Sequence, residues 1–256
     1  MILIISPSKT QQMEGRTVEK YSRPALLDHS AQLVEQLAAM SEDELAGLMK
    51  MSAKLAALSY ERYQKFTLPF TLDNARQALT VFHGDQFSTI AVDDYREDDF
   101  LFAQQHLRIL SGLYGVLRPL DLMQPYRLEM ATRLATDRGK TLYAFWGDLI
   151  TDRIGNTLEE QENPLLVNLA SDEYFKALQP DHLHCPVVKI AFKEIRNNVA
   201  RIIAIHAKRA RGMMVDFVIR HRITDPEMLK NFSSGGYTYS MDLSTEKEWV
   251  FTRSGK

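Results

Sequence analysis

Two short apolar runs, Ile2–Ile5 and Leu165–Leu169, constrain the fold of this chain most strongly. Each is too short for a typical helix. A short run that is aliphatic throughout, like the first, or aliphatic except for Asn168, like the second, is typical of a strand buried on both faces of a sheet. Each run passes directly into a polar motif, Ser6-Pro7-Ser8-Lys9-Thr10 or Asn168-Leu169-Ala170-Ser171-Asp172-Glu173. Helical patterns separate the two runs, so the sequence predicts a mixed α/β protein with a mixed sheet and surrounding helices.

The remaining elements follow from periodicity, capping and turn signals. Ser41 begins a capping box that is followed by leucines at helical spacing, which predicts one helix as far as Leu58. The asparagines of Arg196-Asn197-Asn198 tolerate positive φ and predict a hairpin turn. We further expect helices over 28–39, 98–110, 146–158 and 207–222 and from 224 onward, and strands over 79–82, 187–195, 199–205, 237–239 and 249–251. The last third is expected to be antiparallel, and without visible repeats or linkers the chain is expected to form one compact domain over 1–256.

The composition is that of an ordinary globular protein, with 45% hydrophobic and 25% charged residues. The sequence has no apolar stretch of transmembrane length, and its first five residues are too short for a signal-peptide core. We therefore expect a cytoplasmic protein without a membrane partner. The net charge of −2 argues against a uniformly basic DNA-binding protein, but cations far outnumber anions between Lys189 and Arg222.

The segment 106–130 carries two glycines among basic residues. Gly112 and Gly115 can bring bare backbone amides close to a ligand, because neither has a Cβ atom. Guanidinium groups beside open amides suit a phosphate group, and three arginines flank the glycines: Arg108, Arg118 and Arg127. One interpretation is a helix–hairpin–helix-like element near 98–123. The other is a C-cap glycine that ends a helix and leads into a buried turn.

The two polar motifs predict a shared crevice. In open α/β sheets, ligands bind beyond the carboxyl ends of strands, at the point where the strand order reverses. If the two apolar strands are parallel neighbours, Lys9 offers a positive charge there, and Asp172 or Glu173 offers a carboxylate for a base, a metal or a ribose hydroxyl. The alternatives are a solvated lysine and an ordinary helix start capped by Ser171.

A basic run follows the last predicted hairpin. Lys208 and Arg211 are three residues apart and share a helix face, whereas Arg209 points elsewhere. Basic groups near a helix N-terminus oppose the helix dipole and favour a nearby anion, and a solvated basic face is the alternative.

Two aromatic positions have a similar choice of roles. Arg127 follows Tyr126 and could clamp a phosphate or pair with Glu129. Trp146 could stack on a base or belong to the core.

The cluster His182-Leu183-His184-Cys185 contains metal-ligand residue types. Adjacent residues of a strand point to opposite faces, and no second pair at metal-ligand spacing accompanies the cluster. We therefore predict no metal site and no cofactor.

Five blocks in fixed order carry a family resemblance: Ser6–Thr10, the glycine segment at 106–130, Tyr143–Asp148, Asn168–Lys176 and His206–Gly212. Together they resemble the YaaA family of bacterial peroxide-stress resistance proteins over nearly the whole chain. The resemblance implies a cytoplasmic protein that limits oxidative damage by holding down unincorporated iron. It also implies DNA binding through an element likened to a helix–hairpin–helix.

Two functions are therefore predicted. The first is largely sequence-independent binding of double-stranded DNA through a positively charged cleft, with the amides of Gly112–Gly115 and the cations Lys9, Arg108, Arg118, Arg127, Lys208, Arg209 and Arg211. The alternative is an enzyme that encloses a nucleotide or other phosphorylated molecule among Lys9, Arg127, Trp146, Asp172, Glu173, Lys208 and Arg211, with Asp172 or Glu173 as acid–base group and Trp146 stacking. A duplex needs a long open groove, whereas a small ligand needs an enclosed pocket. A third possibility, direct iron sequestration, needs metal ligands that converge on one point.

Overall fold

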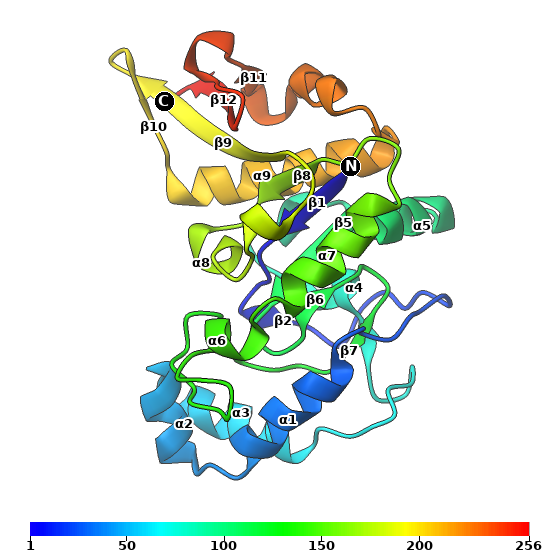
Figure 1. Cartoon of the computed structure of the whole chain (residues 1–256), viewed down its shortest axis with the longest axis vertical. Coiled ribbons are helices and arrows are strands. Elements are labelled where there is room, and N and C mark those ends of the chain that lie inside the picture. Colours follow the sequence, from blue (N-terminus) through cyan, green and yellow to red (C-terminus); the bar gives the residue numbers. More distant parts are fainter. Residues whose placement is uncertain (256) are drawn as a thin grey trace.

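An eight-stranded sheet runs through the centre of the protein in the computed structural model, which describes residues 1–255 (Figure 1). The strand order is β11-β12-β9-β8-β1-β5-β6, and β10 pairs with β9 outside this path. The strands are β1 (Ile2–Ile5), β5 (Leu107–Ser111), β6 (Gly115–Leu117), β8 (Leu166–Leu169), β9 (Val187–Arg196), β10 (Val199–Arg201), β11 (Thr238–Tyr239) and β12 (Glu248–Ser254).

The first apolar run occupies the middle of this sheet. β1 pairs in parallel with β5 on one side and with β8 on the other, so that Ile4 lies between Arg108 and Asn168. All four residues of β1 are buried. The two apolar runs of the sequence are therefore parallel neighbours, because only an interior position covers a strand that has no polar face.

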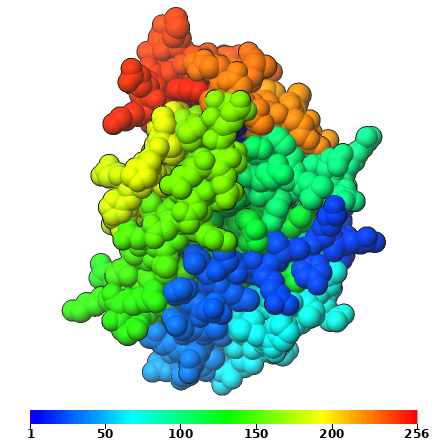
Figure 2. Space-filling model, turned by 45° about the vertical axis from the view of Figure 1, so that its right-hand side comes forward, coloured from blue at the N-terminus to red at the C-terminus, as the bar shows by residue number. Residues whose placement is uncertain are grey.

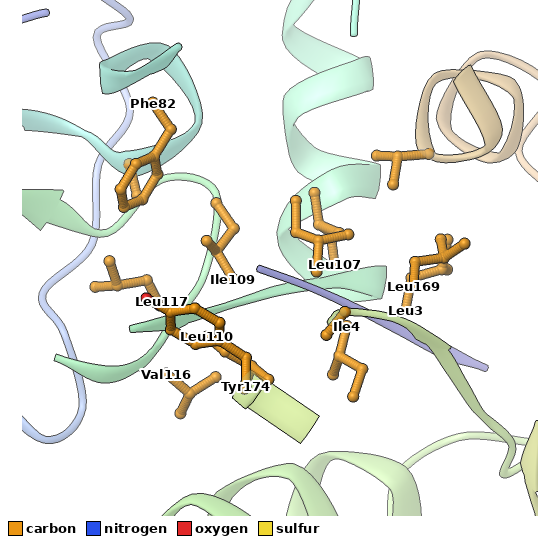
Figure 3. Packing of buried hydrophobic residues seen from close by; sticks show 14 of the residues in the cluster. Leu3, Ile4, Phe82, Leu107, Ile109, Leu110, Val116, Leu117, Leu169 and Tyr174 are labelled. Atoms are coloured by element: carbon orange, nitrogen blue, oxygen red, sulfur yellow. The ribbon is translucent and has the colours of Figure 1, made fainter. Parts of the chain in front are cut away.

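Helices cover both faces of the sheet. In Figure 3 the strands lie between α5 (Glu97–His106) and α9 (Ala204–Arg220) on one side and α7 (Leu149–Glu159) on the other. Leu3, Ile109 and Leu169 belong to the buried cluster that these layers enclose. Burial of an aliphatic side chain of this size contributes about 1.5–3 kcal/mol, so the central strands form the main core.

A group of helices forms one end of the molecule, and the C-terminal segments form the other (Figures 1 and 2). The first group is α1 (Leu27–Ala38), α2 (Glu42–Met49), α3 (Ala53–Gln64) and α6 (Leu142–Trp146). The short elements are β2 (Thr10–Gln11), β3 (Arg76–Gln77), α4 (Ala78–Val81), β4 (Phe82–His83), η1 (Phe87–Thr89), η2 (Val92–Asp94), β7 (Leu122–Met123), α8 (Asp172–Phe175), η3 (Pro180–His182), η4 (Pro226–Asn231), η5 (Ser234–Gly236) and η6 (Met241–Leu243). Within residues 1–255, no helix is both long and apolar enough to cross a lipid bilayer.

The helix expected over 41–58 is wrong, because two helices occupy this stretch. Ser41 forms the predicted capping box with Glu44. Lys50 then adopts a left-handed conformation with φ of 49°, and Ser52 begins α3 in an extended conformation. A left-handed residue ends a helix, so α2 and α3 are separate. The leucine spacing does not mark one buried face, because Leu45 of α2 is buried whereas Leu55 and Leu58 of α3 are exposed.

The helix–hairpin–helix-like element expected near 98–123 is also wrong. The helix ends at His106, and β5 and β6 then form an antiparallel β-hairpin in which Ser111 pairs with Gly115. The apolar stretch Leu107–Leu110 pairs with β1, and this sheet pairing overrides its helical periodicity. The glycines therefore form a buried turn, in which Gly115 has the left-handed φ of 67°.

Other expectations are corrected at element ends. Residues 79–82 are largely the short helix α4, and the helix expected from 146 is interrupted at Gly147, whose φ is 48°. The segment from Pro226 is a 3-10 helix. The hairpin at Asn197 and Asn198 is confirmed, with φ of 51° and 60°. The last third is only partly antiparallel, because β12 pairs with β9 in parallel.

Candidate anion-binding cleft

A cleft of about 460 Å³ lies beyond the carboxyl ends of β1 and β8. The chain leaves β1 toward β5 and leaves β8 toward β9, so the strand order reverses at this point. Ionisable side chains from five separate segments line the cleft: Lys9, Asp85, Arg127, Glu129, Glu173, Lys208 and Arg211. We call this space the anion cleft.

Hydrogen bonds hold the loops that form its floor. The Ser171 amide donates to Ser6 Oγ at 2.9 Å, which ties the loop after β8 to the loop after β1. β2 pairs with β4 in the register Thr10–His83, which brings Gly84 against the first loop. A Cβ atom on Gly84 would lie 2.7 Å from Ser8 Oγ, and its φ is 121°, so only glycine fits here without strain.

One carboxylate organises two cations on the wall. Glu129 Oε1 lies 2.8 Å from Lys9 Nζ and 3.0 Å from Arg127 Nη2. Arg127 and Glu129 are two residues apart in an extended segment, so they lie on one face. Glu129 thereby fixes two positive groups that are 118 residues apart along the chain.

Two arginines present buried nitrogens that lack a hydrogen-bond partner among the described residues. The atoms are Arg127 Nε and Arg211 Nε, and both residues line the anion cleft. Burial lowers the pKa of Arg211 from its ordinary value, and the Asp172 carboxylate partly opposes this. An unpaired donor of a charged group is costly to bury, so these atoms require an acceptor such as a phosphate oxygen.

Glu173 and Asp172 lie in different environments. Glu173 lines the anion cleft, where its Oε1 accepts from the Ala131 amide at 3.2 Å, and no ion-pair partner for it is found in the described part of the chain. Asp172 is 86% exposed and pairs with Lys189 at 2.9 Å, and this hydrogen bond lowers its pKa. Glu173 is therefore the carboxylate of this pair that a bound ligand would meet.

Several sequence-predicted residues lie in the interior of the protein and do not line the anion cleft. Trp146 is fully buried, and its indole N–H donates to the Gly112 carbonyl at 3.0 Å. Arg108 is buried and donates to the carbonyls of Gln104 and Leu107 at 2.9 and 2.8 Å. Burial lowers the Arg108 pKa to about 10. These two side chains and the Gly112 turn form interior structure.

The other basic residues predicted for phosphate binding differ in whether they reach the anion cleft. Arg118 pairs with buried Asp121 at 2.9 Å and does not line the anion cleft. Lys208 and Arg211 lie together on the cleft side of α9, whereas Arg209 is directed to Asp85 at 3.7 Å. Of the nine positions predicted for phosphate binding, four line the anion cleft: Lys9, Arg127, Lys208 and Arg211.

Sequence reasoning missed the full role of Glu129, which pairs with Arg127 as one alternative had it but also holds Lys9 in the cleft. The run His83-Gly84-Asp85 at the end of a predicted strand gives only a weak sequence signal for ligand binding, and the structure places Gly84 and Asp85 in the lining of the cleft.

Cys185, His182 and His184 line a separate cavity of about 200 Å³. His182 Nδ1 lies 3.0 Å from Asp148 Oδ1. Within residues 1–255, no group of three or more His, Cys, Asp or Glu side chains is arranged to hold a metal ion.

Comparison with known proteins places the chain in a family. A family model described as peroxide stress protein YaaA matches residues 1–243. A protein of Acaryochloris marina, described as a UPF0246 protein, is 54% identical over 254 residues, which cover 99% of this chain and 100% of that protein. The chain belongs to the YaaA family of peroxide stress proteins.

Proposed function

We propose that the anion cleft binds the phosphate of a nucleotide, supplied by a DNA strand or by a free nucleotide. The observation that carries this proposal is the pair of buried, unpartnered nitrogens, Arg127 Nε and Arg211 Nε, in one cleft. Lys9 and Lys208 add charge at the same cleft. Guanidinium groups bind phosphate oxygens through strong charge-assisted hydrogen bonds.

The size of the cleft decides which form of DNA it accepts. A volume of about 460 Å³ falls within the usual range for a small-molecule pocket. A duplex is too wide to enter, since its major groove alone is about 12 Å across. We therefore propose that DNA enters as an unpaired nucleotide, at a strand end or after displacement from the stack, while any duplex remains outside.

Binding to DNA would also connect the family's peroxide-stress role with iron. DNA phosphates collect cations, and a protein that neutralises phosphates with lysine and arginine releases those cations. A protein bound in this way would displace Fe²⁺ from the strand it covers. In this proposal the protein protects DNA by occupying phosphates.

The test uses fluorescence anisotropy with a labelled single-stranded oligonucleotide, a duplex of the same sequence, and free nucleotides as competitors. Arg211→Ala is expected to weaken all nucleotide binding about tenfold or more, because it removes a charge-assisted contact. Arg153→Ala is the matched control, because Arg153 is an exposed residue of α7. Equal affinity of the wild type and Arg211→Ala would refute the site, and displacement by free nucleotide distinguishes the two ligand sources.

Catalysis on the bound nucleotide is a second candidate function. The supporting observation is Glu173, a carboxylate inside the cleft that is positioned by the Ala131 amide and has no ion-pair partner in the described region. Such a group can accept a proton from a ligand hydroxyl or amino group. We expect the wild type to convert the bound nucleotide and the Glu173→Gln variant to bind the nucleotide without converting it. Chromatography of the incubated mixture measures the conversion. Conversion at the wild-type rate by the variant would exclude this role.

A further inference from the structure

We propose that a second cleft, beside the anion cleft, receives the next nucleotide of a single strand whose phosphate occupies the anion cleft. This inference rests on the proposed function. The second cleft has a volume of about 400 Å³ and is formed by α3, by residues near Met13 and by the segment that contains Gln124 and Pro125. The sequence analysis did not select any of its residues.

Consecutive residues of one segment, 124–127, line the two clefts. Gln124 and Pro125 line the second cleft, and the next two residues, Tyr126 and Arg127, line the anion cleft. The Tyr126 amide donates to Gln11 Oε1 at 2.8 Å, which fixes this segment as the wall. A ligand longer than one nucleotide could therefore pass over the wall without a rearrangement of the fold.

Arg62 supplies the second cleft with an uncommitted charge. It lies on α3, half-buried, and has no hydrogen-bond or ion-pair partner among residues 1–255. Burial lowers its pKa, the charges of Tyr63 and Glu61 oppose this, and repulsion from Arg127 lowers it further. The neighbouring Tyr63 hydroxyl donates to the Arg127 carbonyl, so α3 touches the wall segment at this point. A second phosphate beside Arg62 would offset this repulsion, since two successive phosphates can satisfy the two cations, one each.

The other cations of the second cleft are already occupied. Lys65 pairs with Glu61 one turn earlier on α3. The Arg76 guanidinium donates to the carbonyls of Leu72 and Ala75, the latter at 2.8 Å. Arg62 is therefore the cation that distinguishes this cleft from an ordinary surface groove.

The remaining wall suits a base without reading its sequence. Leu58 and Pro125 offer apolar surface. The Gln124 amide group is used within the fold, because it exchanges hydrogen bonds with the backbone of Thr67 at 3.2 and 3.1 Å. A groove with one phosphate-binding cation and apolar contact for the base is typical of sequence-tolerant single-strand binding.

The experiment measures the affinity of the full chain for thymidine monophosphate and for 5′-phosphorylated dithymidylate by titration calorimetry. We expect the wild type to bind the dinucleotide about tenfold more tightly than the mononucleotide, because one further charge-assisted contact is made. Arg62→Ala is expected to lose this gain and to keep its mononucleotide affinity within about twofold. Arg62→Lys is expected to recover part of the gain, and Arg153→Ala serves as the control.

The outcomes separate this inference from the proposed function. If the wild type binds both ligands equally, the second cleft is not a nucleotide site, although the anion cleft remains one. If Arg62→Ala weakens both ligands alike, Arg62 acts through Arg127 and the inference is also wrong. If the mononucleotide does not bind to the wild type, the proposed function itself fails, and the inference fails with it. Thermal unfolding of each variant shows whether a loss comes from the fold.

Discussion

At the scale of single residues, the role of an arginine in this protein depends on which acceptors the fold supplies. Arg108 and Arg211 are both desolvated. Arg108 donates to two backbone carbonyls, whereas Arg211 Nε is buried without a partner among the described residues. The first arrangement satisfies the charged group inside the fold, and the second leaves it ready for a ligand.

Substitution of Arg108 tests this division. Arg108→Ala is expected to lower the free energy of unfolding by about 2–4 kcal/mol, because it removes buried hydrogen bonds to a charged group and leaves carbonyls unsatisfied. Nucleotide affinity of the folded variant is expected to remain that of the wild type. Urea unfolding and anisotropy measure the two effects, and a tenfold loss of affinity with unchanged stability would contradict the interior role.

The buried Glu194 carboxylate makes stability depend on pH. It is 2% exposed and lies 2.6 Å from Arg253 and 3.1 Å from Arg196, and His206 also contacts it. The hydrogen bond from Arg253 is the largest cause that lowers its pKa in the fold. A lowered carboxyl pKa stabilises the native state above the pKa of the unfolded chain, and this stabilisation is lost as pH falls through the lower folded value.

Glu194→Gln is therefore expected to destabilise the protein by about 1.5–3 kcal/mol at pH 7, because it removes the charge-assisted hydrogen bonds that the buried carboxylate makes with Arg253 and Arg196. Below about pH 4.3, the ordinary pKa of a glutamate, the difference from the wild type is expected to shrink, because the unfolded chain then binds the proton and the folded carboxyl, with its lowered pKa, binds it only at still lower pH. Urea unfolding between pH 3 and pH 7 measures this change. A difference that stays constant across this range would show that the charge of Glu194 does not contribute.

At the scale of secondary structure, the packing of α9 positions one wall of the anion cleft. Gly212 lies in this helix directly over the segment 86–89, where a Cβ atom would overlap the Gln86 carbonyl oxygen and Thr89 Oγ1. The Thr89 hydroxyl donates to the Arg209 carbonyl at 2.8 Å and so links η1 to α9. The close approach requires glycine and places Arg211 at the cleft.

Gly212→Ala is expected to destabilise the protein by about 1–3 kcal/mol, because the added methyl group forces α9 away from η1. It is also expected to weaken nucleotide binding, because Arg211 moves with the helix. Gly47→Ala is the matched control, since nothing lies within 4 Å of a Cβ atom there and alanine favours the helix α2 by up to about 1 kcal/mol. Thermal unfolding compares the pair, and equal stabilisation by both changes would contradict the packing argument.

At the scale of the whole molecule, charge is distributed unevenly. The chain has a net charge of −2, yet two lysines and two arginines meet in the anion cleft with the carboxylates Asp85, Glu129 and Glu173. In the proposed function, binding of a polyanion depends on this small local excess of positive charge, against a weakly negative remainder.

This arrangement predicts a small salt dependence of DNA affinity. Each neutralised phosphate of a single strand changes the slope of log affinity against log salt by about −0.7. If three or four phosphates are contacted, the slope is expected to be about −2 to −3, far less than that of a protein that follows a long duplex. Anisotropy over a range of salt concentrations measures it. A slope near zero would exclude phosphate contacts, and a much steeper slope would indicate a broader DNA-binding surface outside the cleft.

Several parts of the molecule could be predicted from sequence because the signals are local. The apolar run Ile2–Ile5 required a buried strand whatever surrounded it, and the paired asparagines at 197 and 198 specified their turn. The helical pattern at 98–110 failed at Leu107 because pairing with β1 outweighed periodicity. Local propensity differs by less than 1 kcal/mol between most residues, whereas burial in a sheet involves several times that amount.

The sequence by itself determined the two buried strands, the α/β class and the family, and it indicated that Lys9 and the pair Asp172 and Glu173 follow those strands. Only the tertiary structure decided that Asp172 turns to Lys189, that Trp146 and Arg108 are interior, and that Glu129 holds two distant cations together. The reason is physical: a run of side chains fixes its own burial pattern, but the partner of a charged group is set by segments that meet only after the chain has folded.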